Sequence, residues 1–182
     1  QPSNAIDEDR DSIAAYIDLE TDVTDRFTVS AAARAESYSD FGETVTGKLA
    51  ARYQLTDALA LRGAVSNGFR APSLQQAYFT STSTVFTGTP PTPVEVGTFP
   101  ATSPVAAALG GEPLEAEESL NISGGLVFAQ GGFTLTVDAY AIDIDDRIVL
   151  SENLSGPDVE ALLVNAGITN ITSARFFING VE

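Results

Sequence analysis

Apolar and polar side chains alternate along most of the chain with a period of two residues. In residues 12–20, for example, Ile13, Ile17 and Leu19 stand at odd positions, whereas Asp18 and Glu20 stand at even positions. A strand shows this period because successive side chains point to opposite faces of its sheet. The pattern predicts six strands, at residues 12–20, 27–36, 46–55, 59–70, 119–128 and 133–141.

The two faces of these predicted strands differ in charge. Thirty positions on the apolar side carry no charged residue. The charged residues of the opposite side are Asp18, Glu20, Arg34, Glu36, Lys48, Arg52, Arg62, Arg70 and Asp138. Each strand spans nine to twelve residues, whereas globular strands usually have about five or six and tilted strands that cross a bilayer need about nine to eleven. Length and pattern together favour the wall of a transmembrane β-barrel.

The links between the strands are unequal in length. Short links at residues 21–25, 56–58 and 129–132 alternate with longer ones at 37–44, 71–118 and 151–172. Outer-membrane barrels alternate short periplasmic turns with long external loops in the same way. Aromatic residues lie beside the short links on the apolar side, at Phe27, Tyr53, Phe128 and Phe133. They predict an aromatic girdle, although aromatic residues also favour strands in general.

The two longest links carry their own signals. Residues 80–104 are rich in Thr, Ser and Pro, and because proline interrupts regular structure we expect a mobile, exposed loop that could contact a ligand. Residues 156–167 place Pro157 at a helix start and Gly167 after its end, which predicts a short helix. A seventh strand is expected to begin near Ser173.

Composition excludes several classes of function. The chain has no Cys and no His, which removes disulfides, the usual zinc sites and Ser-His-Asp or Cys-His catalysis. Its net charge of −16 repels a phosphate backbone, so we expect no nucleic-acid partner. An acidic cluster at Asp143, Asp145 and Asp146 matches no calcium loop. We therefore expect no enzyme activity, no metal and no cofactor.

The ends and the hydropathy of the chain bear on its placement. No run of eighteen apolar residues occurs, which excludes a membrane-spanning helix but leaves membrane-spanning strands open. The N-terminus does not begin with Met and has no signal-peptide pattern. We therefore interpret the chain as a fragment of a longer protein.

Four segments resemble one known family. Phe69-Arg70-Ala71-Pro72-Ser73 ends a strand before a long loop, and residues 114–121 are similar to the pattern Leu-x-Pro-Glu-x-Ser-x-Asn, with Ala116 in place of Pro. Residues 138–148 and 174–180 look like further segments of the same family, in the same order. The chain thus resembles the C-terminal β-barrel region of TonB-dependent outer-membrane receptors, from about Arg10 to Glu182.

The resemblance implies an all-β fold: an antiparallel meander of long strands that forms part of a large transmembrane β-barrel, with long external loops and one short loop helix. Residues 1–182 would be one partial barrel without its plug domain. It implies energy-coupled uptake of a bulky, scarce nutrient, such as a ferric siderophore, cobalamin or an oligosaccharide, across the outer membrane of a Gram-negative bacterium. The implied partners are outer-membrane lipid, the plug, the remaining strands, TonB and the ligand. A plugged barrel needs about twenty-two strands, so six or seven cannot transport alone.

Five basic residues share the polar side of the predicted strands: Arg34, Lys48, Arg52, Arg62 and Arg70. In a barrel they would form a stripe facing the lumen. We favour ion pairing within wall and plug, with Asp18, Glu20 and Glu36 as cross-strand partners; contact with an anionic ligand is the alternative.

Two other classes of protein remain open from the sequence. One is a secreted soluble β-sandwich or adhesin-type binding module, and the other is a small self-contained outer-membrane barrel. Burial distinguishes a sandwich from a barrel wall. A sandwich would cover Leu49, Leu61, Val65 and Leu126 with a second sheet, whereas a barrel wall would leave them facing outward.

Overall fold

The computed structural model describes residues 7–87, 89–169 and 171–180. It divides into two compact units. The sheet unit comprises Asp11–Arg70 and Glu117–Asp145, and the loop unit comprises Gln1–Arg10, Ala71–Ala116 and Asp146–Glu182. No helix among the described residues is long and apolar enough to cross a membrane.

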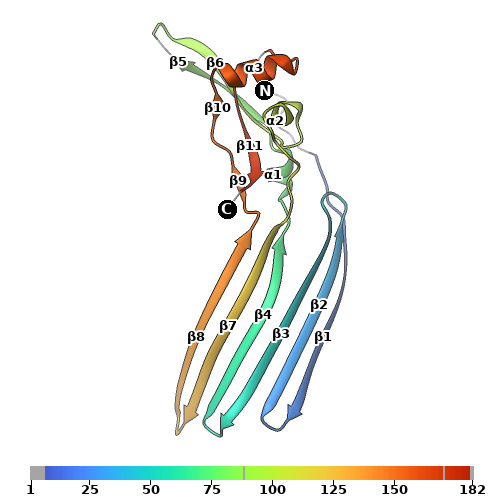
Figure 1. Cartoon of the computed structure of the whole chain (residues 1–182), viewed down its shortest axis with the longest axis vertical. Coiled ribbons are helices and arrows are strands. Elements are labelled where there is room, and N and C mark those ends of the chain that lie inside the picture. The colour runs from blue at the N-terminus through green and yellow to red at the C-terminus, as the bar shows by residue number, and fades with distance from the viewer. Residues whose placement is uncertain (1–6, 88, 170, 181–182) are drawn as a thin grey trace. The chain divides into compact units, whose positions relative to one another are not determined.

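The sheet unit is one antiparallel sheet of six strands, in the order β1-β2-β3-β4-β7-β8 (Figure 1). The strands are β1 (Ser12–Thr24), β2 (Phe27–Tyr38), β3 (Gly42–Thr56), β4 (Leu59–Arg70), β7 (Glu117–Gln130) and β8 (Phe133–Asp145). All six predicted strands are confirmed. Five are longer than predicted because residues at their ends continue the pairing, whereas β4 has the predicted bounds.

The register keeps the uncharged positions of neighbouring strands on one face. Leu49 lies opposite Ala31 on one side and Val65 on the other, and Val65 lies opposite Ile122. The exposed fractions are 59% for Leu49, 43% for Leu61 and 40% for Val65. Leu126 is half-buried. No second sheet covers this face within the described residues, which contradicts the β-sandwich alternative.

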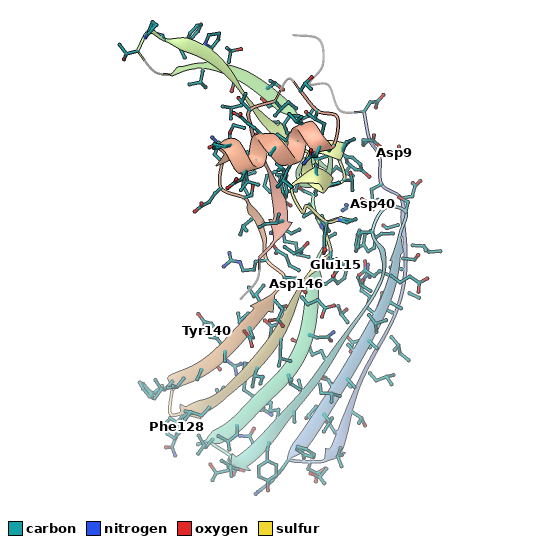
Figure 2. The ribbon with its side chains drawn as sticks, turned by 45° about the horizontal axis from the view of Figure 1, so that its top comes forward. Asp9, Asp40, Glu115, Phe128, Tyr140 and Asp146 are labelled. Carbon is teal, nitrogen blue, oxygen red and sulfur yellow. The ribbon has the colours of Figure 1, made fainter. Side chains whose placement is uncertain are left out.

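Three hairpins turn within two residues, at 25–26, 57–58 and 131–132, as the short links predict. Gly131 and Gly132 both have positive φ, the backbone conformation that a tight two-residue hairpin requires. The predicted aromatic residues pair beside these turns: the ring centroids of Phe27 and Tyr53 lie 6.1 Å apart, and those of Phe128 and Phe133 lie 6.4 Å apart. Figure 2 labels Phe128 at this end of the sheet.

The link predicted at residues 37–44 is wrong in length, because β2 and β3 continue to a turn of only three residues, 39–41. Phe41 in this turn packs against Tyr38 and Phe69, with centroid distances of 4.5 Å and 6.3 Å. The pairing of β3 with β4 has already ended at Lys48 and Ser66. Beyond that point Asn67 bridges the two strands: its Oδ1 accepts from the Gly47 N–H at 2.7 Å and its Nδ2 donates to the Val45 carbonyl at 3.0 Å.

The loop unit contains short helices and a small mixed sheet. Its elements are α1 (Leu74–Tyr78), β5 (Ser81–Thr87), β6 (Thr92–Phe99), α2 (Pro104–Ala108), β9 (Ile148–Leu150), β10 (Leu154–Ser155), α3 (Pro157–Asn165) and β11 (Ser173–Asn179). The sheet order is β10-β11-β6-β5, with β9 also on β11. The predicted helix is confirmed as α3, with Pro157 in its first turn and Gly167 at φ +80° after its end.

One prediction for this unit is wrong, and another is confirmed in a different sheet. Residues 80–104 contain the hairpin β5–β6 rather than an irregular loop. Pro90 and Pro91 lie in its turn, Pro93 lies within β6 opposite Phe86, and Pro100 and Pro104 lie beyond the last strand residue. The predicted seventh strand exists as β11, but it is not a further strand of the six-stranded sheet. It pairs in parallel with β6 and antiparallel with β9 and β10.

A small hydrophobic core holds the loop unit together. Leu163 and Ala174 are fully buried, and Val105 is 7% exposed. Partly buried apolar side chains pack around them, at Phe99, Ala108, Leu109, Val159, Ile168 and Ile171. The core therefore joins residues of both long links.

Candidate functional site on the charged face of the sheet

The register places all five predicted basic residues on one face of the sheet unit. Arg52 lies directly opposite Arg62, and Lys48 lies between Ala32 and Ser66. Arg34 lies opposite Thr46, and Arg70 opposite Glu117. The sequence pattern correctly assigned these side chains to a common face, and their environments differ in one respect, the presence of a carboxylate partner.

Arg62 on β4 forms an ion pair with Asp138 on β8, and this pair spans more strands than any other ion pair described on this face. Arg62 Nη2 donates to both carboxylate oxygens, at 2.9 Å and 2.6 Å, and its Nε donates to Oδ1 at 3.0 Å. Such a forked arrangement fixes the orientation of both groups. Asp138 was recognised in the sequence as a residue of the charged face but not as this partner.

Gly125 on β7 makes this pair possible. In the register it stands between the two charged residues, opposite Arg62 on one side and Asp138 on the other. A Cβ at this position would collide with the Asp138 carboxylate and lie 2.8 Å from the Val137 carbonyl oxygen. Cross-strand register, which would have identified the role of Gly125, is not visible in one sequence.

Two further basic residues have carboxylate partners. Arg70 Nη1 donates to both oxygens of Glu117, at 3.0 Å and 2.9 Å, and the Glu117 side chain is only 10% exposed. Arg34 forms a salt bridge with Glu36 on its own strand, and the Tyr38 hydroxyl donates to the same carboxylate at 2.5 Å.

None of the three acidic residues predicted as cross-strand partners forms a cross-strand salt bridge among the described residues, because Glu36 pairs within its own strand. Glu36 forms a salt bridge, whereas Asp18 and Glu20 form none within the described part of the chain. The acceptors that the sequence reading missed are Glu117 and Asp138.

Lys48 and Arg52 differ from the other three basic residues, because neither forms a salt bridge with any residue that the structure describes. Arg52 Nη2 donates to the neutral Gln54 side chain at 2.5 Å. Directly opposed like charges destabilise a strand pair, and Asp138 can neutralise only Arg62. The centre of β3 thus carries two basic side chains that have no salt-bridge partner among the described residues.

Two recesses open on this face. One, of about 420 Å³, has Arg52, Arg62, Asp138, Glu20 and Asp22 in its lining. The other, of about 300 Å³, has Lys48, Arg34, Asp18 and Tyr16 in its lining. Small residues surround the charges, including Ala32, Ala50, Ala64 and Ser66. These recesses could accept side chains or a ligand without rearrangement of the backbone.

The segment Phe69 to Ser73 crosses from one unit into the other. Phe69 packs on Tyr38 with a centroid distance of 5.9 Å. Pro72 is buried, and its carbonyl accepts from Arg10 Nη2 at 2.6 Å. Ser73 caps α1, where its side chain accepts from the Gln76 N–H. Ala71 is half-buried between them. These residues end a strand and begin a helix.

The acidic cluster at residues 143–146 is divided between the units. Asp143 and Asp145 belong to β8, opposite Leu120 and Glu118, whereas Asp146 belongs to the loop unit and its carbonyl accepts from Asn179. Within residues 7–87, 89–169 and 171–180, no group of three acidic side chains could share a metal ion.

Comparison with known proteins identifies the family. The whole sequence, residues 1–182, matches the family model described as TonB dependent receptor-like, beta-barrel. No curated protein gives a significant match.

Solved structures share the fold at low sequence identity. The siderophore receptor PirA from Pseudomonas aeruginosa gives a TM-score of 0.68 at 17% identity, over 94% of this chain and 29% of that one. The siderophore receptor PirA from Acinetobacter baumannii gives 0.65 at 18%, over 94% and 24%. A variant of the ferric enterobactin receptor PfeA from Pseudomonas aeruginosa, in complex with enterobactin, gives 0.67 at 14%, over 93% and 22%.

The chain spans less than a third of the length of each of these receptors. Members of the matched family are outer-membrane transport proteins of Gram-negative bacteria rather than enzymes. Because the family model covers every residue and the solved receptors share its fold, the chain belongs to the TonB-dependent receptor β-barrel family.

Proposed function

We propose that this chain is part of the wall and external loops of an outer-membrane receptor that takes up a ferric siderophore with energy relayed through TonB. The observation that carries the proposal is the division of one sheet into an exposed, uncharged face and a reverse face rich in charges. Lipid tails favour the first face and water or protein the second. The ligand class is supported by the solved structures of the same fold, which are siderophore receptors.

In this proposal the charged face lines the barrel and meets the plug domain. Arg34, Arg62 and Arg70 stabilise the wall itself, since each has a carboxylate partner within the sheet. Lys48 and Arg52 have none among the described residues, so they are the positions at which acidic side chains of the plug bind.

Uptake of a radiolabelled ferric siderophore by whole cells tests the function. Deletion of the gene for the full-length receptor should abolish energy-dependent uptake, and re-expression should restore it. Uptake that continues unchanged in the deletion strain, for every siderophore that supports growth of the parent strain, would contradict the assigned function.

The double variant Lys48→Gln/Arg52→Gln tests the plug contact in the full-length receptor. A plug that has lost these contacts should leave the barrel partly open, so cells should become more sensitive to vancomycin, a large antibiotic that the intact outer membrane excludes. Arg26→Gln is the control, because it removes an exposed positive charge from the β1–β2 turn. Weaker siderophore uptake without increased vancomycin sensitivity would instead indicate an anionic ligand at these residues. No change in either measurement would refute both assignments.

A further inference from the structure

The two long links fold together into one unit. Strand β6 from the first link and β11 from the second pair in parallel, with Val96 opposite Ser173 and Phe99 opposite Phe176. Leu163 and Ala174 pack with Val105 in a common core. The side chains on the surface of this unit are therefore held by a folded scaffold. Binding groups on such a scaffold lose little conformational freedom when a ligand arrives.

A cavity of about 560 Å³ lies within this unit. Its size falls in the range of about 300–1,000 Å³ that is typical of small-molecule sites. Strands β5 and β6 contribute Ser83, Val85 and Val96, and the second link contributes Asn153, Ser155, Gly156, Glu160, Thr172, Ser173 and Arg175. Both links are therefore needed to form the cavity.

The polar groups of the cavity are oriented by their neighbours. Arg175 Nε donates to the Thr98 hydroxyl at 2.9 Å, and this hydrogen bond fixes the orientation of the guanidinium group. The Ser173 hydroxyl donates to Asn153 Oδ1 at 2.6 Å, so the Asn153 amide presents its NH₂ group as a donor.

Arg175 and Glu160 line the same cavity but form no salt bridge with each other or with any other described residue. The cavity thus presents a cation and an anion at separate positions. None of its lining residues is aromatic, which disfavours ligands recognised by ring stacking. A group with both a carboxylate and an ammonium complements this arrangement.

We propose that this cavity binds a zwitterionic, peptide-like group, with the carboxylate held by Arg175 and the ammonium by Glu160. The assignment deepens the proposed receptor function, since it makes the captured nutrient a ligand with a peptide-like portion. Binding to the purified receptor can be measured apart from transport, so failure of one does not imply failure of the other.

Triglycine is the probe, and its blocked forms are the matched ligands. Saturation-transfer NMR on the purified full-length receptor in detergent micelles should show triglycine binding about tenfold more tightly than N-acetyltriglycine or triglycine amide, because each block removes one charged contact. Equal binding of all these forms, or no detectable binding of triglycine, would overturn the proposal without the use of any variant.

Variants of the receptor then test which residue binds the carboxylate end of triglycine and which binds the ammonium end. Arg175→Gln should remove the preference for a free carboxylate, and Glu160→Gln should remove the preference for a free ammonium, each with an affinity loss of about tenfold. Arg175→Lys should recover part of the loss. Arg147→Gln and Asp158→Asn are the controls, since they lie in the same unit outside the cavity lining.

Hydrogen exchange of Ser173–Phe176 shows whether each variant keeps its fold. Arg175→Gln removes a hydrogen bond to Thr98, whereas Glu160 is exposed on α3 and its replacement should leave protection unchanged. Variants that retain protection and also retain full preference for the zwitterion would disprove the site.

Discussion

Gly125 has no side chain, and this leaves the space that an ion pair on the charged face of the sheet occupies. The forked pair of Arg62 and Asp138 crosses β7 at this residue. Any larger residue would occupy the space of the carboxylate. Arg52 also depends on this arrangement, because without Asp138 it would lie opposite an Arg62 that has no salt-bridge partner.

Substitution of Gly125 by Ala should destabilise the receptor, because the new Cβ displaces Asp138 and breaks its pair with Arg62. Gly124→Ala is a close control: the nearest atom to its added Cβ is the Arg62 carbonyl oxygen at 3.9 Å. We expect the temperature at which the full-length receptor loses its compact, fast-migrating form on SDS gels to fall for Gly125→Ala only. Equal effects of the two substitutions would show that Gly125 has no special role.

Among the elements of the loop unit, α3 contributes one fully buried side chain to the core. Leu163 is fully buried, whereas its neighbour Leu162 is 50% exposed. Replacement of a buried leucine by alanine costs about 2–5 kcal/mol because it leaves a cavity.

Leu163→Ala should therefore lower the protection of the β11 amides against hydrogen exchange in the full-length receptor, while Leu162→Ala should leave it near that of the unaltered protein. Amides of β3 and β4 belong to the sheet unit and serve as an internal reference. If β11 exchanged at the same rate in both variants, the core around Leu163 would not be what holds the two links together.

The long strands were predictable because the information that defines them is local. Alternation at Leu49, Ala51 and Tyr53 identifies a strand whatever lies beside it. Strand β6 carried no such signal, since its stability comes from β5 and from β11, which follows more than seventy residues later in the chain. The partner of Arg62 was missed for a related reason. An odd or even position in a strand gives the face on which a side chain lies. Only the register across β4, β7 and β8 shows that Asp138 lies beside Arg62.

At the scale of the whole molecule, the exposed apolar face defines the environment that the protein needs. Side chains at Leu49, Val65 and Ile122 are 40–59% exposed in a continuous row across β3, β4 and β7. Such a face is an aggregation liability in water and a suitable contact for hydrocarbon.

Two adjacent residues on β4 test this arrangement. Val65 lies on the apolar face, and Ala64 lies on the charged face opposite Ala50 and Ser123. A lysine in contact with the middle of a bilayer costs about 2–4 kcal/mol. Val65→Lys should therefore reduce the amount of folded receptor in the outer membrane, and Ala64→Lys should be tolerated. Normal membrane levels of Val65→Lys would argue against lipid contact at this face.

Strand β6 is synthesised long before the strand that completes its sheet. The entire β7–β8 hairpin lies between them in the chain, so Val96–Phe99 wait for Ser173–Phe176. Until then Leu163 and Ala174 are also missing from the core, and pairing over such a separation is intrinsically slow. A chain that ended after Asp145 would contain all six strands of the sheet unit but neither β11 nor Leu163, so the parallel pair with β6 and the core of the loop unit could not be completed.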